Sequence, residues 1–95
     1  MRNYENLIIF DPDIDEENRE KKVELIKTLI EKEEGKVLNI DRWGIKEFTY
    51  LINKKQKGYY MLIEFSANEK VLPELNRELK LSQEVMRHSI IRKGK

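Results

Sequence analysis

Few side chains in this sequence of 95 residues could carry out catalysis. The chain has no cysteine and one histidine, His88, so it lacks thiolate nucleophiles, zinc–cysteine sites and a cluster of histidine ligands. Ser89 follows His88 in a segment that we predict to be a strand, where neighbouring side chains point to opposite faces. The two residues therefore form no nucleophile–base pair, and we predict that His88 simply fills a strand position and that the chain is not an enzyme.

Two other motifs associated with ligand chemistry are incomplete. The four glycines stand singly, so the sequence has no glycine-rich loop that could cradle a phosphate. Asp11, Asp13 and Asp15 alternate as in a calcium loop, but Pro12 interrupts them and the glycine expected at the sixth position is missing. We predict that these aspartates form a turn and a helix cap, and that the protein uses no metal, no cofactor and no small-molecule substrate.

Charge is distributed unevenly along the chain, although the net charge is only +1. Residues 11–35 contain ten acidic and five basic side chains, whereas residues 36–95 contain thirteen basic and seven acidic ones. Acids gathered near the start of a helix would explain part of this pattern. The segregation also suits a protein that turns one surface to solvent and another to a polyanion.

Basic residues in the second half of the chain lie close to aromatic ones. One group surrounds Trp43 and Tyr50, and the other lies at the last predicted strand. The basic members of the two groups are Arg42, Lys46, Lys54, Lys55, Lys57, Arg87, Arg92, Lys93 and Lys95. Because cations neutralise phosphates while tyrosine and tryptophan stack on unpaired bases, the combination favours an RNA-binding surface over a merely solubilising one.

The first part of the chain predicts a strand followed by a helix. Positions 4–10 are rich in aliphatic and aromatic residues, and the turn residues of positions 11–13 end that strand. The helix that follows has Asp15 as its N-cap, with Ile14 packing back onto the first turns. Gly35 is predicted at the C′ position, just beyond the helix end.

The rest of the chain predicts a hairpin, a second helix and a last strand. Residues 36–65 favour a long hairpin that is bent at Gly44 and connected through residues 54–58. A second helix is predicted near residues 69–80. Because proline is tolerated only in the first turn, this helix either starts near Lys70 or is distorted at Pro73. Residues 85–92 form the closing strand.

This order of elements predicts the fold class. Two right-handed strand–helix–strand units place the first and third strands side by side in the centre of one sheet. The fold is therefore α+β, a ferredoxin-like βαββαβ sandwich in which two helices cover one face of a four-stranded antiparallel sheet. We expect residues 1–95 to form this single domain. The sequence has neither an apolar run long enough to span a membrane nor a secretory signal, so we expect a soluble intracellular protein.

The uncovered face of the predicted sheet is rich in hydrophobic residues. Alternation along the strands places on it Leu7, Ile9, Tyr60, Leu62 and Ile91. An apolar patch of this size on a free monomer is typical of a docking surface. The alternative is that the long bent hairpin folds over part of it.

Short motifs spread along nearly the whole chain, from Met1 to about Lys93, resemble those of a known family. They are Met1-Arg2-x-Tyr4-Glu5, Asp11-Pro12, Asp41-x-Trp43-Gly44 with Lys46, Tyr50-x-Ile52-x-Lys54, Gly58-x-Tyr60, and Val85-x-Arg87 with Arg92. In their order and spacing they are similar to those of bacterial small-subunit ribosomal protein six. That family has the same ferredoxin-like fold.

The resemblance implies a structural, non-enzymatic role on the ribosome, in the cytoplasm. Members of the family bind the central domain of small-subunit (16S) ribosomal RNA as a heterodimer with small-subunit ribosomal protein eighteen. Carried over by position, the residues expected to contact RNA or this partner are Arg2, Tyr4, Lys46, Tyr50, Lys54 and Arg87. We add Tyr60, on the uncovered face, and Arg92, in the last strand.

The sequence departs from the family pattern in two places. Thr49 and Leu51 flank Tyr50, where the family often has Ala-Tyr-Pro. Many members also carry a longer and charged C-terminal tail, whereas this sequence stops at Lys95, so we assign no contact to such a tail.

Other activities occur on the same fold, and two alternatives stay open. A ferredoxin-like small-molecule-sensing or regulatory domain would need a pocket with convergent polar groups, which the sequence does not indicate. A generic RNA-recognition module would use sheet aromatics such as Tyr60, but the basic-Gly-aromatic signature of those modules is missing.

Overall fold

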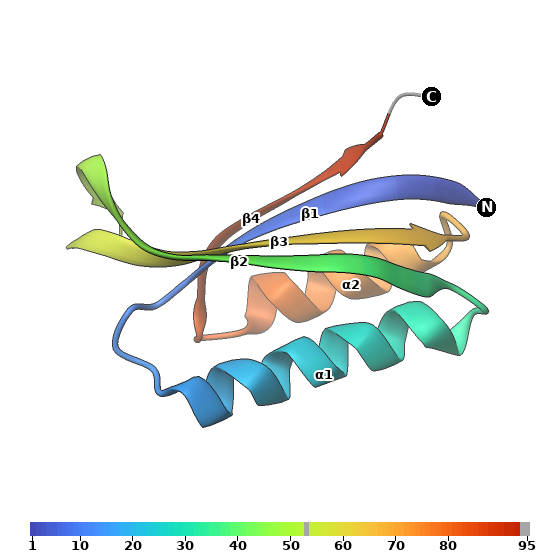
Figure 1. Ribbon diagram of the computed structural model, residues 1–95, viewed down its shortest axis with the longest axis horizontal. Coiled ribbons are helices and arrows are strands. Elements are labelled where there is room, and N and C mark those ends of the chain that lie inside the picture. Colours follow the sequence, from blue (N-terminus) through green and yellow to red (C-terminus); the bar gives the residue numbers. More distant parts are fainter. Residues whose placement is uncertain (53, 94–95) are drawn as a thin grey trace.

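The computed structural model describes residues 1–52 and 54–93, and it confirms the predicted order of elements (Figure 1). The strands are β1 (Arg2–Phe10), β2 (Lys36–Ile52), β3 (Lys55–Ala67) and β4 (Val85–Arg92). The helices are α1 (Glu16–Lys32) and α2 (Val71–Leu81), and neither is long and apolar enough to cross a membrane. Lys95, which was assigned to the basic group of the last strand, lies outside the described residues.

The four strands form one antiparallel sheet in the order β2-β3-β1-β4, so β3 and β1 are central as predicted. Both helices lie on the same side of the sheet and leave its other face open (Figure 1). On β1 the side chains of Tyr4, Ile8 and Phe10 point to the helices and are buried. Those of Leu7 and Ile9 point to the open face. The structure confirms the ferredoxin-like α+β sandwich.

Helix α1 begins as predicted and ends one residue earlier. Asp15 caps the N-terminus, since its Oδ1 accepts a hydrogen bond from the Asn18 amide (2.9 Å). At the C-terminus Glu34, not Gly35, takes the left-handed conformation (φ 66°), so the prediction for Gly35 was wrong. Position 35 has no room for a side chain, because an added Cβ would lie 2.4 Å from the carbonyl oxygen of Ile30. The amide of Gly35 donates a hydrogen bond to this same oxygen.

Helix α2 accommodates its proline without distortion. It starts at Val71, which puts Pro73 in the first turn, where backbone amides have no intrahelical partner in any case. Of the two alternatives for Pro73, the helix start near Lys70 is therefore the correct one. The helix ends at Leu81, one residue later than predicted.

Strands β2 and β3 form the predicted long hairpin, but its connection is shorter than expected. Strand β3 already begins at Lys55, and Gly58 pairs with Lys46 of β2. The prediction that residues 54–58 are a loop was therefore wrong. The lysines of this segment can belong to a strand because the projecting end of the hairpin is solvated. The bend at Gly44 is confirmed, since the pairing shifts by one residue there and Gly44 has a φ of 90°.

The hydrophobic core fills the space between the sheet and the two helices. Ile26 of α1 and Leu75 of α2 are fully buried against Phe10 and Phe65 of the central strands. One polar side chain, Asn6, is also fully buried, and its amide has no hydrogen-bond partner among the described residues. Burial of the helix-facing side of the sheet leaves the open face as the surface on which β1, β3 and β4 can meet a ligand.

Candidate nucleic-acid and partner interface

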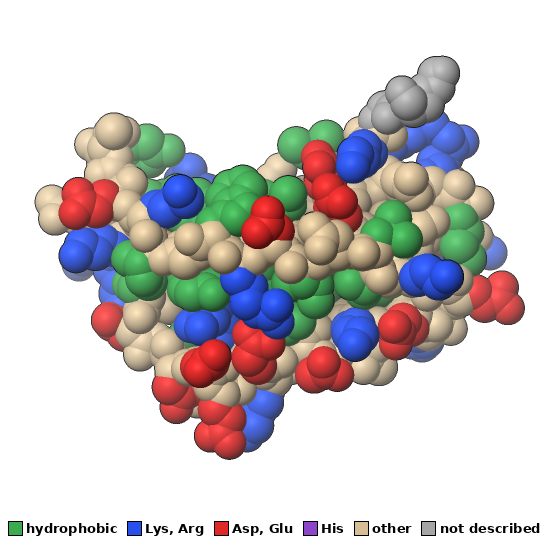
Figure 2. All heavy atoms as spheres, viewed as in Figure 1, with side chains coloured by type: hydrophobic (Ala, Val, Ile, Leu, Met, Phe, Trp, Pro, Cys, Tyr) green, Lys and Arg blue, Asp and Glu red, His purple; other side chains and the backbone are tan. Residues whose placement is uncertain are grey.

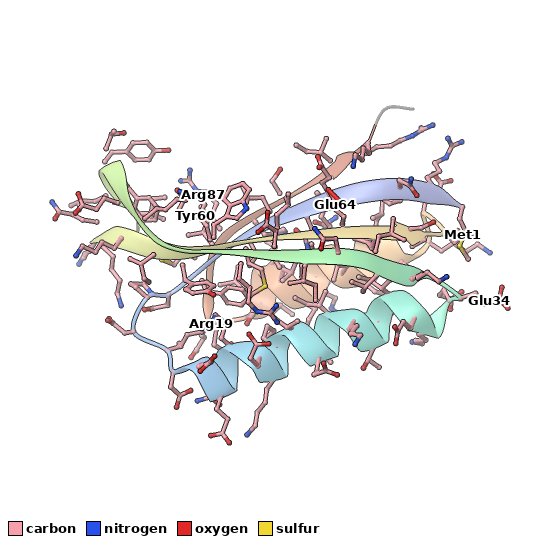
Figure 3. All side chains as sticks on the ribbon, in the orientation of Figure 1. Met1, Arg19, Glu34, Tyr60, Glu64 and Arg87 are labelled. Atoms are coloured by element: carbon pink, nitrogen blue, oxygen red, sulfur yellow. The ribbon has the colours of Figure 1, made fainter. Side chains whose placement is uncertain are left out.

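Four of the predicted contact residues come together on the open face of the sheet, near the projecting end of the β2–β3 hairpin. With two further aromatic residues they form a group that we call the aromatic–basic cluster: Trp43, Lys46, Phe48, Tyr50, Tyr60 and Arg87. Figure 3 shows Tyr60 and Arg87 on one side of the sheet and α1 with Arg19 on the other. The cluster thus combines three elements, β2, β3 and β4, on one surface.

The bulge at Gly44 positions Trp43 in this cluster. The backbone of Gly44 has a φ of 90°, which residues with a side chain rarely adopt. The extra residue turns Trp43 onto the open face, where its ring stacks on Tyr60 with centroids 6.2 Å apart and planes inclined by 15°. The Nζ atom of Lys46 lies 6.0 Å from the centroid of the Trp43 ring.

Phe48 folds the hairpin end back onto the sheet. Its ring is tilted by 53° against Tyr60, with centroids 6.1 Å apart. An added Cβ at Gly58 would lie 2.7 Å from Phe48 Cζ and 2.5 Å from Ile9 Cγ2. Glycine at position 58 therefore allows Phe48 to cover Ile9, which is only 7% exposed. Phe48 was not among the residues predicted from the sequence.

Arg87 connects the edge strand β4 to the hairpin. Its Nη1 donates a hydrogen bond to the hydroxyl oxygen of Tyr50 (3.3 Å), and both side chains are exposed. A guanidinium carries five N–H donors, so Arg87 can hold Tyr50 and still bind a phosphate. Lys54, at the hairpin turn, is exposed and adds positive charge at this end of the molecule.

The centre of the open face is apolar, as predicted, but less of it is exposed than expected. Leu7 and Leu62 lie opposite each other on β1 and β3 and are half-buried, as is Tyr60. Ile91 of β4 is 58% exposed. Because Phe48 covers Ile9, the alternative that the hairpin folds over part of the patch is correct for that residue. Figure 2 shows hydrophobic side chains in the hollow beside the raised hairpin end.

The other end of the open face is acidic. Glu5 and Glu64 lie opposite each other on β1 and β3, and Asp41 of β2 lies opposite Leu62. Figure 3 shows Glu64 on the same side of the sheet as Tyr60. The Nζ atom of Lys93 lies 3.4 Å from Glu64 Oε1, which balances one of these charges. The open face therefore runs from a basic, aromatic end through an apolar centre to the acids Glu5 and Glu64, beyond which lie Lys36 and Lys93.

Three predicted contact residues lie away from the cluster. Tyr4 is 3% exposed and stacks on Phe65 with centroids 5.4 Å apart, so it supports the core and does not reach a ligand. Assigning Tyr4 a contact overlooked that it alternates in phase with the buried Ile8. Arg2 and Arg92 are exposed at the outer ends of β1 and β4. They lie on the helix side of the sheet, since Arg92 pairs with Tyr4, whose side chain points to the helices.

Two basic residues of the hairpin are used within the protein. Arg42 binds Glu20 of α1 through two hydrogen bonds, and this pairing holds the pKa of the Glu20 carboxyl below its usual range. Lys55 donates to Asp11 and Asp13, and the pKa of Asp11 is lowered chiefly by its hydrogen bond to Lys55. Arg42 thus ties the hairpin to α1 and Lys55 ties it to the turn after β1, so both cations are less available to a polyanion.

The residues that could have suggested catalysis or metal binding have structural roles. Asp11 Oδ1 accepts the Asp13 amide (2.8 Å), so the aspartates form the predicted turn and cap. His88 lies in β4 with Nε2 3.2 Å from Asn76 Oδ1, and burial lowers its pKa. No group of three or more potential metal-ligating side chains occurs in residues 1–52 and 54–93.

The sequence matches a family of known proteins over most of its length. The family model described as Ribosomal protein S6 matches residues 3–92. The chain is 44% identical over 92 residues to the small ribosomal subunit protein bS6 of Thermoanaerobacter pseudethanolicus, covering 97% of each. It is 45% identical over 91 residues to the protein of the same name from Clostridium novyi, covering 96% of each.

A solved structure has the same arrangement of elements. The crystal structure of 30S ribosomal protein S6 from Thermotoga maritima superimposes with a TM-score of 0.89 at 34% sequence identity. The similarity covers 97% of this chain and 87% of that one.

Proposed function

The chain belongs to the ribosomal protein S6 family of the small ribosomal subunit, and from this premise we propose that it binds small-subunit ribosomal RNA together with a second subunit protein. Family membership confirms the resemblance noted in the sequence and agrees with a structural, non-enzymatic protein of the ribosome. It also favours this role over a small-molecule sensor. The observation that carries the proposal is the aromatic–basic cluster on the open face.

The cluster offers the two interactions that an unpaired RNA segment needs. Trp43 and Tyr50 are 43% and 61% exposed, which leaves ring surface on which bases could stack. Lys46 and Arg87 lie beside these rings and can neutralise the neighbouring phosphates. Lys54 extends the positive charge along the hairpin end.

The remainder of the open face suits a protein partner better than RNA. Glu5 and Glu64 would repel phosphates, whereas they would attract basic side chains of a protein. Leu62 and Ile91 supply apolar area beside them. By the family resemblance this partner is small-subunit ribosomal protein eighteen. A partner that adds positive charge would also compensate for the net charge of only +1.

Arg2 and Arg92 would form a second, smaller contact. Arg87 pairs with Ile9 and Arg92 with Tyr4, so the two groups are offset by five positions along β1, about 17 Å at the usual rise per residue. A single nucleotide cannot bridge that span.

Calorimetric titration of the protein with ribosomal protein eighteen tests the assignment of the partner surface. Ile91→Glu should weaken the complex by about tenfold or more, because it places a charge in the buried apolar contact. Leu25→Glu is the matched control, since Leu25 of α1 is 38% exposed and lies on the helix side. Equal affinity of the Ile91→Glu variant and the unsubstituted protein would refute the assignment.

A further inference from the structure

Strand β4 has an unpaired edge that can accept another strand. Within residues 1–52 and 54–93, β4 pairs only with β1. The Lys93 amide donates to the Asn3 carbonyl (2.8 Å), which sets the phase of the antiparallel ladder. Since inward and outward backbone groups alternate along a strand, Ile91 also bonds to β1. The residues whose N–H and C=O groups point away from the sheet are then His88, Ile90 and Arg92.

A groove runs beside this edge, between β4 and helix α2. Its walls are formed by Pro73, Asn76, Arg77, Lys80, Leu81 and His88. It continues past Lys80 and His88 to Val85, Met86 and Arg87 at the start of β4. A strand added to β4 would therefore direct every second side chain towards α2.

The groove is positively charged because the acids of α2 lie towards α1. Arg77 and Leu81 lie between the two sides of α2 and also line the cleft between α1 and α2, beside Glu74 and Glu78. The acids Glu74 and Glu78 turn to α1, where they lie 3.5 Å from Lys32 Nζ and 3.0 Å from Lys22 Nζ. Arg77 and Lys80 line the groove, and none of the ion pairs among the described residues involves them. The lining of the groove includes no acidic side chain.

We propose that β4 accepts an extended acidic segment of another protein as a fifth strand, seated in the α2–β4 groove. The alternating donors and acceptors of β4 match a peptide backbone, and the carboxylates of that segment would pair with Arg77 and Lys80. Leu81, which is 70% exposed, and Pro73 give its aliphatic side chains an apolar contact.

The lining of the groove favours a peptide over RNA. The rings that could stack on bases, those of Trp43, Tyr50 and Tyr60, lie on the open face, whereas the groove is lined by aliphatic and polar side chains and His88. A nucleic-acid backbone also lacks the repeating N–H donors that would satisfy the carbonyls of β4. The proposal goes beyond the RNA-binding function and concerns the edge of β4 and the groove beside α2.

Nuclear magnetic resonance on the ¹⁵N-labelled full chain provides the test. The probe is a blocked peptide of four Glu-Val repeats, and the matched control peptide has lysine in place of every glutamate. We expect the acidic peptide to shift the amide signals of His88, Ile90 and Arg92 and to slow their hydrogen exchange. The lysine peptide should bind at least about tenfold more weakly.

A pair of charge reversals separates this site from general attraction between opposite charges. Lys80→Glu should weaken binding of the acidic peptide by about fivefold to tenfold. Lys21→Glu, which changes an exposed lysine of α1 by the same charge, should leave it unchanged. The proposal is overturned if the amides of β4 exchange as before, if Lys21→Glu has the same effect, or if a single-stranded RNA shifts the groove residues and the peptide does not.

Discussion

Phe48 lies against Gly58, and the contact leaves no room for a side chain at position 58, because an added Cβ would be 2.7 Å from Phe48 Cζ. The same Cβ would be 2.5 Å from Ile9 Cγ2. This contact bends the hairpin end over the sheet and brings β2 close to β4. The shape of the candidate RNA surface therefore depends on the packing of Phe48 against Gly58.

Gly58→Ala should displace Phe48 and lower the free energy of unfolding by about 1–3 kcal/mol, as overpacking does. Urea denaturation of the variant measures the loss. Gly44→Ala is the comparison, since an added methyl there meets no atom within 4 Å and the cost comes only from the φ of 90°. A Gly58→Ala protein as stable as the original would show that Phe48 does not rest on position 58.

Asn6→Leu should stabilise the fold by about 1 kcal/mol, because it removes a buried amide that lacks hydrogen-bond partners among the described residues. Thermal and urea unfolding provide the measurement. Ile26→Ala, which opens a cavity in the same core, should instead cost about 2–5 kcal/mol. A loss of stability in Asn6→Leu would mean that the amide holds an internal water molecule.

Stability should fall in acid as the ion pairs of the hairpin are lost. The pKa values of Asp11 and Glu20 are lowered in the folded protein, chiefly by hydrogen bonds to Lys55 and Arg42. Because these pKa values are lower than in the unfolded chain, the stabilisation is complete above roughly pH 5 and is lost as the pH falls through the folded values.

Urea unfolding at a series of pH values between neutrality and roughly pH 3 measures this effect. Lys55→Met removes the partner of Asp11, so its stability should depend less on pH in the acid range than that of the unsubstituted protein. Parallel curves for the two proteins would contradict the role given to this ion pair.

Trp43, the only tryptophan, should report RNA binding directly. Its ring is 43% exposed and stacks on Tyr60, so a base that stacks on its free surface would quench its fluorescence. The signal should saturate with RNA in the presence of the partner protein. Tyr60→Leu, which removes the ring beneath Trp43, should reduce the quenching. Unchanged emission at saturating RNA would place the RNA elsewhere.

Most of the fold could be predicted from the sequence because its elements have clear periodicities. The apolar stripe of α1 and the cap at Asp15 defined a helix, and the alternation of β1 and β3 defined central strands. The burial of Tyr4 was also readable, since Tyr4 shares the phase of Ile8 and Phe10. Only its place in the family motif suggested a contact.

The remaining features depend on tertiary structure. Phe48 was missed because the bulge at Gly44 shifts the alternation of β2, so the face on which each side chain lies cannot be counted from the sequence. The partners Lys55 and Asp11 are separated by 44 residues, and only the folded hairpin brings them together. Separation of acidic and basic ends on one face follows from the same strand register, in which Glu5 lies opposite Glu64.

The most direct test of the proposed function is a filter-binding titration with the central domain of small-subunit ribosomal RNA, with and without ribosomal protein eighteen. We predict saturable binding only when the partner is present, and affinity about tenfold lower for Arg87→Ala. That variant should change the free energy of unfolding by less than about 0.5 kcal/mol, because Arg87 is exposed on the edge strand. Lys21→Ala should bind as the original does. Tight, specific binding by this protein alone, or equal affinity of Arg87→Ala, would contradict the proposed function.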